Sequence, residues 1–326
     1  MQQLTVAILG GGAMGTACGW VLARNGHRAV LVPREPSRAA DINDRRENVR
    51  HLPGVTLPEG LSAAKTLPPC DAVLVAVPSR FLRQSLTEHR PPGDVRAISV
   101  VKGIEADTLA RPSEIITAVW GPRPVAVLGG PSHAEEIVAR QPTSVVAAGE
   151  ASLAADVQTA FGNDRFRVYT NADVAGVELS GALKNVIGLA AGICDGVGFG
   201  DNAKAALLTR AISEMGRFGQ ALGADPQTFA GLAGVGDLIT TCVSPHGRNR
   251  AVGERLGRGE TLDQITAGVS SVAEGVSTAR AVAQLAHRHG VEMPIVDEVC
   301  AVLFEGKSPQ AATDSLMTRP YRDEQD

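Results

Sequence analysis

The chain has 326 residues, too many for one ordinary hydrophobic core, so its length predicts two domains. Hydrophobic residues make up 44% and charged residues 20% of the sequence, which excludes a disordered chain and a disulfide-rich scaffold. The net charge is −4 and the basic residues form no stripe, so a nucleic-acid partner is not expected.

The cysteines and the amino terminus predict a cytoplasmic protein. The five cysteines are scattered and form no C-x-x-C pair, which is the usage expected in a reducing compartment. Residues 1–9 have neither the basic flank nor the small-residue cleavage site of a signal peptide. The most apolar long stretch, 174–199, contains Glu178, Lys184 and Asp195, so we interpret it as a buried helix and not as a membrane span.

The first half of the chain alternates short apolar runs with helix-like segments, which is the pattern of a parallel sheet covered on both faces. Several runs are apolar almost throughout, as strands buried on both sides are. We therefore predict a doubly wound α/β domain over residues 1–172. The predicted strands are 4–9, 29–32, 72–77, 97–101, 125–128 and 144–148.

The second half has a different character. From about Asn171 the strand-like runs give way to Ala-, Leu- and Gly-rich segments with helical spacing. We therefore predict an all-helical domain over residues 173–326. The predicted helices are 174–191, 204–222, 250–256, 278–287 and 295–304.

The first predicted strand continues directly into the sequence GGGAMG, a G-x-G-x-x-G motif that opens a helix. Gly10 permits a tight turn, Gly12 lets the backbone approach a pyrophosphate, and Gly15 lets the helix pack closely on the strand. The positive N-terminus of the helix then faces the negative charge of the ligand. The motif predicts a Rossmann-type dinucleotide site that also includes Ala13 and Met14.

The end of the second predicted strand bears on the choice of dinucleotide. Arg34 stands where an NAD-selective fold usually offers an acid to the ribose hydroxyls, and it could instead hold a 2′-phosphate. Glu35 is adjacent and could restore NAD binding, and Arg34 could also be an ordinary loop charge. We expect NADP(H) to be favoured, with NAD(H) possible.

Ligands of such sheets lie beyond the carboxyl ends of the strands, so the turns that follow the strands are candidate sites. Lys102 follows one predicted strand and would place a cation in the crevice. The turn from Gly130 to Ser132 offers backbone N–H groups and a hydroxyl. The alternative for each is a plain surface turn.

The helical half offers a second set of polar residues. Lys184 lies among small and apolar residues, and burial there would lower its pKa toward the range useful for proton transfer. Spacing alone favours the alternative, a lysine that extends to solvent at the helix edge. Asp237 lies between helices, and Arg248 and Asn249 stand where the next helix should begin, so they could converge on a substrate phosphate or be solvated polar groups. The seven histidines show no metal-binding spacing, so no metal is predicted.

Taken together, these residues resemble the bacterial NAD(P)-dependent glycerol-3-phosphate dehydrogenase family, and the match runs through essentially the whole chain. Ten blocks in the same order are far more specific than any one of them. The agreeing blocks are 10–16, 52–54, 77–79, 102–105, 130–136, 176–185, 202–206, 236–238, 248–249 and 274–275.

The resemblance implies reversible reduction of dihydroxyacetone phosphate to sn-glycerol 3-phosphate, which feeds glycerophospholipid synthesis. Lys184 would be the proton donor and acceptor, assisted by Lys102 and Asp237, while a hydride passes from the nicotinamide to the keto carbon. A homodimer formed through the helical half is also implied. The implied substrate ligands are Lys102, Gly130, Ser132, Lys184, Asp237, Gly247, Arg248 and Asn249. The implied cofactor contacts beyond the glycine-rich motif and Arg34 are His51, Lys102, Ala134, Arg248, Val272 and Glu274.

Five positions depart from the usual pattern of the family. Met14 stands where an aromatic residue is common, His51 where tyrosine is usual, and His133 where phenylalanine is usual. Ala203 replaces a usual threonine and Gly247 a usual serine. The last two changes remove hydroxyl groups on the substrate side, so we expect altered affinity and intact chemistry.

Two other functions fit the same residues. One is a dehydrogenase of the same two-domain plan that acts on a different hydroxy acid or sugar phosphate, since Arg248 could bind a carboxylate as readily as a phosphate. The other is a non-catalytic NADP sensor, which would bind the cofactor tightly without turnover. The presence of both Lys102 and Lys184 argues against a sensor.

Overall fold

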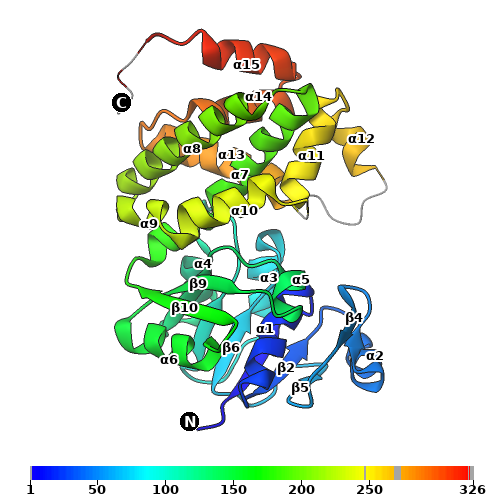
Figure 1. Cartoon of the computed structure of the whole chain (residues 1–326). Helices are drawn as coiled ribbons and strands as arrows, with labels where there is room; N and C mark the ends of the chain where they lie inside the picture. The colour runs from blue at the N-terminus through cyan, green and yellow to red at the C-terminus, as the bar shows by residue number, and fades with distance from the viewer. Residues whose placement is uncertain (1, 246, 268–272, 322, 324–326) are drawn as a thin grey trace.

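The computed structural model describes residues 2–245, 247–267, 273–321 and 323. Figure 1 shows the sheet and its covering helices at one end of the molecule and the remaining helices gathered at the other. The prediction of a doubly wound sheet followed by a helical half is confirmed.

The sheet has eight strands in the order β10-β9-β8-β7-β6-β1-β2-β5. Every neighbouring pair is parallel except β8 and β9, which are antiparallel. The strands are β1 (Thr5–Leu9), β2 (Arg28–Val32), β5 (Leu61–Ala63), β6 (Ala72–Val75), β7 (Arg96–Ser99), β8 (Val125–Gly129), β9 (Thr143–Ala148) and β10 (Phe166–Asn171). A separate hairpin is formed by β3 (Glu47–Asn48) and β4 (Leu52–Thr56).

All six predicted strands are present, with ends shifted by one or two residues, but the expected all-parallel order fails at β9. The helix between β8 and β9, α5 (Ala134–Val138), has only five residues, and a crossover that returns a parallel strand usually needs a longer helix. β10 was not predicted because its residues alternate between buried and exposed and form no continuous apolar run. β5 was missed because it has only three residues.

Helices cover both faces of the sheet because alternate residues of each buried strand point to opposite sides. Val6 and Ile8 of β1 belong to the core under α1 and α6, whereas Ala7 and Leu9 belong to the core under α3 and α4. The helices of this half are α1 (Ala13–Arg24), α2 (Arg38–Arg45), α3 (Leu82–Glu88), α4 (Pro112–Trp120), α5 and α6 (Ala151–Phe161).

The helical half is built around α7 (Val174–Val197). This helix is long and apolar enough to cross a membrane, but 94% of its most apolar stretch is buried inside the protein, which confirms the interpretation of 174–199 as a core helix. Around it lie α8 (Asp201–Ala221), α9 (Pro226–Ala230), the π-helical turn η2 (Leu232–Gly236), α10 (Asp237–Val243), α11 (Arg248–Gly257), α12 (Leu262–Thr266), α13 (Glu274–Arg288), α14 (Pro294–Phe304) and α15 (Pro309–Met317). The five predicted helices are present, whereas the short helices α9, α10, α12 and α15 were not predicted.

Glycines bring α7 and α11 into backbone contact. A Cβ atom added at Gly192 would lie 2.0 Å from the carbonyl oxygen of Arg250, and one added at Gly253 would lie 2.1 Å from that of Leu189. Real Cβ atoms do not approach a backbone oxygen so closely, so larger side chains would force the helices apart. This close packing fixes the N-terminus of α11 against the middle of α7.

Candidate active site

The glycine-rich motif forms the turn from β1 into α1. Gly10 has a φ of +116°, and a Cβ there would lie 2.5 Å from the carbonyl oxygen of Ala76, so only glycine fits. A Cβ at Gly15 would lie 2.2 Å from the carbonyl oxygen of Gly10. A Cβ at Gly12, in contrast, would meet nothing within 4 Å. Because no side chain caps α1, the N–H groups at Ala13 and Met14 remain for a pyrophosphate, and the residues present therefore fit a dinucleotide.

A buried asparagine that sequence reasoning missed supports this turn. Asn48 is fully buried, and its Nδ2 atom donates hydrogen bonds to the Gly11 carbonyl at 2.9 Å and to the Thr16 hydroxyl at 2.8 Å. Its Oδ1 atom accepts a hydrogen bond from Arg38 at 3.0 Å. No motif in the sequence marks Asn48, since it reaches the turn through the fold of the β3–β4 hairpin.

The end of β2 is rich in positive charge. Arg34 is exposed there, and Glu35, the acid beside it, forms an ion pair of 2.9 Å with Arg50. The pKa of His51 is lowered by burial and then by the charges of Arg38 and Arg50, while Glu35 opposes the shift. The guanidinium groups therefore outnumber the one acid that could bind ribose hydroxyls.

Two lysines and an aspartate meet where the sheet joins the helical half. Lys102 follows β7, Lys184 lies in the middle of α7, and Asp237 is the first residue of α10. The Nζ atom of Lys184 lies 2.5 Å from Oδ1 of Asp237, and the Nζ atom of Lys102 lies 2.6 Å from Oδ2. Lys102 also donates to the carbonyl oxygen of Gly130 at 3.3 Å. The structure thus brings together three residues that lie far apart in the sequence.

Burial and mutual attraction set the charges of this cluster. Burial lowers the pKa of Lys184, the Asp237 charge opposes the shift and the Lys102 charge adds to it, so that the pKa of Lys184 is about 8. Burial on its own would raise the pKa of Asp237, but the charges and hydrogen bonds of Lys102 and Lys184 outweigh it and hold that pKa below its ordinary value. Lys184 can therefore gain or lose a proton near neutral pH while Asp237 remains ionised.

The interpretation of Lys184 as a lysine that extends to solvent is wrong. Only 8% of Lys184 is exposed, because α7 is buried continuously from Gly176 to Cys194 and leaves no solvent edge at this position. Spacing could not show this, since the small residues on every side of α7 are covered by other helices. The carboxylate of Asp237, in place of water, pairs with the charged amine of Lys184.

The start of α11 provides a second set of polar groups. Gly247 is its N-cap and Arg248, its first residue, is exposed. A Cβ at Gly247 would lie 2.7 Å from the carbonyl oxygen of Thr241, so this turn is tighter than the serine usual in the family would permit. Asn249 is held inside, because its amide donates to Oδ1 of Asn185 at 2.9 Å and accepts from the Gly275 N–H at 2.9 Å.

Asn185 is a further candidate site residue. It lies in the matching block 176–185 but was not predicted to bind the substrate or the cofactor. It follows Lys184 on α7 and is buried, and its Nδ2 atom has no hydrogen-bond partner among the described residues. A buried amide without a partner is costly, so this N–H is available to a bound ligand.

The other proposed site residues lie around these groups. Gly130 and Ser132 form the turn after β8, and the Ser132 hydroxyl donates to the Gly130 carbonyl at 3.0 Å. Ala134 is buried at the start of α5. Glu274 begins α13 and accepts a hydrogen bond of 3.0 Å from the N–H of Ser79, in the turn after β6. Val272 lies outside the described residues.

Arg34 and His51 belong to the other end of the candidate site, at β2 and the β3–β4 hairpin, and are not part of the lysine cluster. Within the described ranges, no group of three or more histidine, cysteine, aspartate or glutamate side chains is arranged to hold a metal ion.

Comparison with known proteins places the whole chain in one family. Residues 5–155 match the family described as "NAD-dependent glycerol-3-phosphate dehydrogenase N-terminus", and residues 173–314 match its C-terminal counterpart. Proteins named "Glycerol-3-phosphate dehydrogenase [NAD(P)+]" are 48% identical in Geobacillus thermodenitrificans, over 99% of this chain and 97% of the relative, and 48% identical in Chlorobium limicola, over 98% and 99%. The crystal structure of glycerol-3-phosphate dehydrogenase from Coxiella burnetii has a TM-score of 0.92 at 36% identity and covers 97% of this chain and 99% of its own. The chain therefore belongs to the NAD-dependent glycerol-3-phosphate dehydrogenase family.

Proposed function

We propose that this chain catalyses the reversible, NAD(P)H-dependent reduction of dihydroxyacetone phosphate to sn-glycerol 3-phosphate, and so supplies glycerophospholipid synthesis. The observation that carries this proposal is the buried cluster of Lys102, Lys184 and Asp237 beyond the carboxyl ends of the strands. Ligands of doubly wound sheets bind at that edge. The names of the relatives agree with this reaction.

The nicotinamide supplies the hydride that reaches the keto carbon when the cofactor is bound. Lys184, protonated, gives its proton to the substrate oxygen as negative charge develops there, and in the reverse direction the neutral amine accepts that proton. Asp237 holds Lys184 in place through the 2.5 Å contact and remains ionised throughout. Lys102 stabilises the developing charge on the same oxygen. A lysine whose pKa is about 8 suits both directions.

The substrate phosphate would bind at the start of α11. The N-terminus of this helix has no side-chain cap, and the exposed guanidinium of Arg248 lies at the same point. Asn185 would donate its unpartnered amide N–H to the substrate. The proposed substrate ligands are Lys102, Gly130, Ser132, Lys184, Asn185, Asp237, Gly247, Arg248 and Asn249.

For the cofactor we propose a preference for NADP(H), with NAD(H) as the weaker partner. The excess of guanidinium groups at the end of β2 supports this preference, because a 2′-phosphate carries negative charge and ribose hydroxyls do not. The proposed cofactor contacts are Gly10, Gly12, Ala13, Met14, Gly15, Arg34, His51, Lys102, Ala134, Arg248, Val272 and Glu274.

We also propose that residues 1–172 and 173–326 form the two domains, because the sheet ends at Asn171 and α7 begins at Val174. The family resemblance supports a homodimer formed through the helical half, and the scattered cysteines support a cytoplasmic location. Sedimentation equilibrium of the purified chain tests the dimer, and a monomer at micromolar concentration would contradict it.

A substrate panel tests the reaction. NADPH and NADH are each offered with dihydroxyacetone phosphate, 2-keto acids and 3-keto acids, and oxidation is followed by absorbance. We expect dihydroxyacetone phosphate to be the substrate that oxidises the cofactor. Faster oxidation with a keto acid would favour a dehydrogenase that acts on a different substrate. Tight NADPH binding without any turnover would favour a non-catalytic NADP sensor.

Lys184→Ala tests the mechanism. Loss of a general acid lowers kcat by about 10²–10⁴-fold, while NADPH affinity should stay within about twofold of the parent value. Lys65→Ala is the matched control, because Lys65 is exposed in the loop after β5 and should leave turnover unchanged. Near-normal turnover of Lys184→Ala would remove the proposed role.

A further inference from the structure

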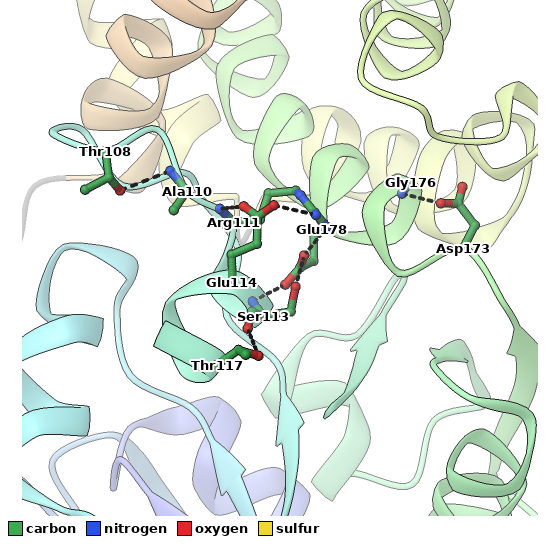
Figure 2. A network of polar contacts seen from close by, with 9 residues as sticks. All are labelled: Thr108, Ala110, Arg111, Ser113, Glu114, Thr117, Asp173, Gly176 and Glu178. Atoms are coloured by element: carbon green, nitrogen blue, oxygen red, sulfur yellow. Dashed lines mark hydrogen bonds and ion pairs between the residues drawn. The ribbon is translucent and has the colours of Figure 1, made fainter. Parts of the chain in front are cut away.

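A second buried ionic cluster lies where the sheet half meets α7. The side chain of Glu178 is fully buried, and its carboxylate accepts hydrogen bonds from the Ser113 N–H at 2.7 Å, from the Ser113 hydroxyl at 2.7 Å and from Arg111 at 2.9 Å. Figure 2 shows Glu178 on α7 pointing at the start of α4, where Arg111 and Ser113 lie. The proposed reaction uses none of these three residues.

The start of α4 is a fixed platform for this contact. Arg111 caps the helix, its N–H donates to Glu114 at 2.8 Å, and its guanidinium pairs with the same carboxylate at 2.7 Å. Farther along α4, Ile115, Ile116 and Trp120 are buried in the core under the sheet. Glu178 therefore connects α7 to a helix that packs against the sheet.

Glu178 is also connected to the lysine cluster through α7 itself. Lys184 follows it by six residues, which is less than two helical turns. Between them, Gly181 faces Lys102, since a Cβ atom added at Gly181 would lie 3.4 Å from Cγ of Lys102. The amino end of α7 is held by Asp173, whose carboxylate accepts a hydrogen bond of 2.8 Å from the Gly176 N–H (Figure 2). Successive turns of one helix thus bind α4, face Lys102 and bind Asp237.

A buried ion pair at this position fixes the orientation of α7 more than it stabilises the fold. Taking a carboxylate out of water costs free energy that its partners only partly return, and apolar residues of similar size often stabilise a protein as well or better. Burial raises the pKa of Glu178 to about 7, against the lowering effects of Arg111 and Ser113, which shows that this cost is present. Three directed hydrogen bonds, in contrast, permit only one position of α7 relative to α4.

We propose that Glu178, Arg111 and Ser113 form a positioning clamp that sets α7, and with it Lys184, against the dinucleotide-binding half of the protein. The clamp touches neither substrate nor cofactor, so its members are positioning residues. The inference rests on the proposed role of Lys184 in proton transfer.

Glu178→Gln tests the clamp, because it removes the charge and keeps the size and one acceptor oxygen. A small displacement of a catalytic group is costly, so we expect kcat to fall about tenfold. The NADPH dissociation constant, measured by fluorescence titration, should stay within about twofold. The midpoint of the kcat–pH profile for reduction should fall by about half a unit, because Asp237 raises the pKa of Lys184 and a looser contact raises it less.

The matched control is Glu114→Gln, the same substitution in the other carboxylate that binds Arg111. Glu114 is half exposed and its hydrogen bonds are to Arg111 and not to α7, so this variant should keep the parent kcat and midpoint. A role in stability alone would lower the melting temperature of Glu178→Gln and leave the midpoint in place. A midpoint at the parent value overturns the proposal, and so does an equal change in Glu114→Gln.

Ser113→Ala keeps the test decisive if Glu178→Gln does not fold. It removes one hydrogen bond and leaves the ion pair intact, so we expect a loss of kcat of about threefold and a fall of the midpoint in the same direction. A parent profile in that variant overturns the clamp. Failure of the proposed function is recognised separately, because the unmodified enzyme would then show no oxidation of NADPH with dihydroxyacetone phosphate, or Lys184→Ala would remain active.

Discussion

The two halves of the candidate site use glycine for opposite purposes. At the turn from β1 into α1, a Cβ on Gly12 would meet no atom within 4 Å, so glycine leaves space open in front of the helix. Between α7 and α11, a Cβ on Gly192 or Gly253 would strike a backbone oxygen at 2.0–2.1 Å, so glycine lets two helices touch. The sheet half therefore makes room for a ligand, whereas the helical half achieves its geometry through packing.

The packing has a direct consequence for the polar residues of the helical half. Because α11 lies against α7, Asn249 reaches Asn185 at 2.9 Å, beside Lys184. Arg248 then stands at the start of α11, where the proposed phosphate site lies. If the two helices moved apart, this set of residues would separate, while the glycine-rich turn would be unaffected.

Gly192→Ala should have the largest effect. The added methyl group cannot fit 2.0 Å from the Arg250 oxygen, so the helices must separate and the free energy of unfolding should fall by about 3 kcal/mol, measured by urea denaturation. Gly216→Ala is the matched control. It lies inside α8 with no atom near its added Cβ, and alanine should raise stability there by about 0.5–1 kcal/mol. Equal stability of the two variants would contradict the role of Gly192 in the close packing of α7 and α11.

Gly12→Val tests the glycine-rich turn of the sheet half. Gly12 has a φ of −80°, which any residue adopts, and its surroundings are open, so the melting temperature should hardly change. NADPH should bind more than about tenfold more weakly, because the side chain would occupy the approach of the pyrophosphate. Fluorescence titration gives the affinity and thermal denaturation the stability. An unchanged affinity would show that the pyrophosphate does not pass Gly12.

These two halves also differ in what the sequence could predict. The glycine motif and the apolar strands are local signals, so the turn and most of the sheet followed from the sequence directly. The contact of Gly192 with α11 is not local, and although the apolar composition of 174–199 predicted a buried helix, it did not show which helices cover it at Lys184. Asn48 was not predicted either, because it reaches the turn from a hairpin that is distant in the sequence. The meeting of Lys102, Lys184 and Asp237 was expected only through the family resemblance.

The pH dependence of the rate sharpens the role of the helical half. Burial, opposed by Asp237, lowers the pKa of Lys184 to about 8. Reduction needs the protonated amine, so kcat should fall by about tenfold for each pH unit well above 8. Oxidation of glycerol 3-phosphate needs the neutral amine, so its kcat should rise up to about pH 8 and then level. Initial rates at saturating substrate measure both profiles, and a parallel dependence in the two directions would contradict proton transfer by Lys184.

Arg34→Asp tests the sheet half with the smallest expected effect. Arg34 is exposed over the Phe81 ring, with the guanidinium carbon 5.3 Å from the ring centroid, so its charge is screened by solvent and is worth about 1 kcal/mol. The ratio of kcat/KM for NADPH to that for NADH should therefore fall about fivefold. Arg28→Asp is the matched control, because Arg28 is exposed at the opposite end of β2 and should leave the ratio unchanged. Glu35 is paired with Arg50, so it does not replace Arg34 in the choice between the two cofactors. An unchanged ratio in Arg34→Asp would mean that the end of β2 does not hold the 2′-phosphate.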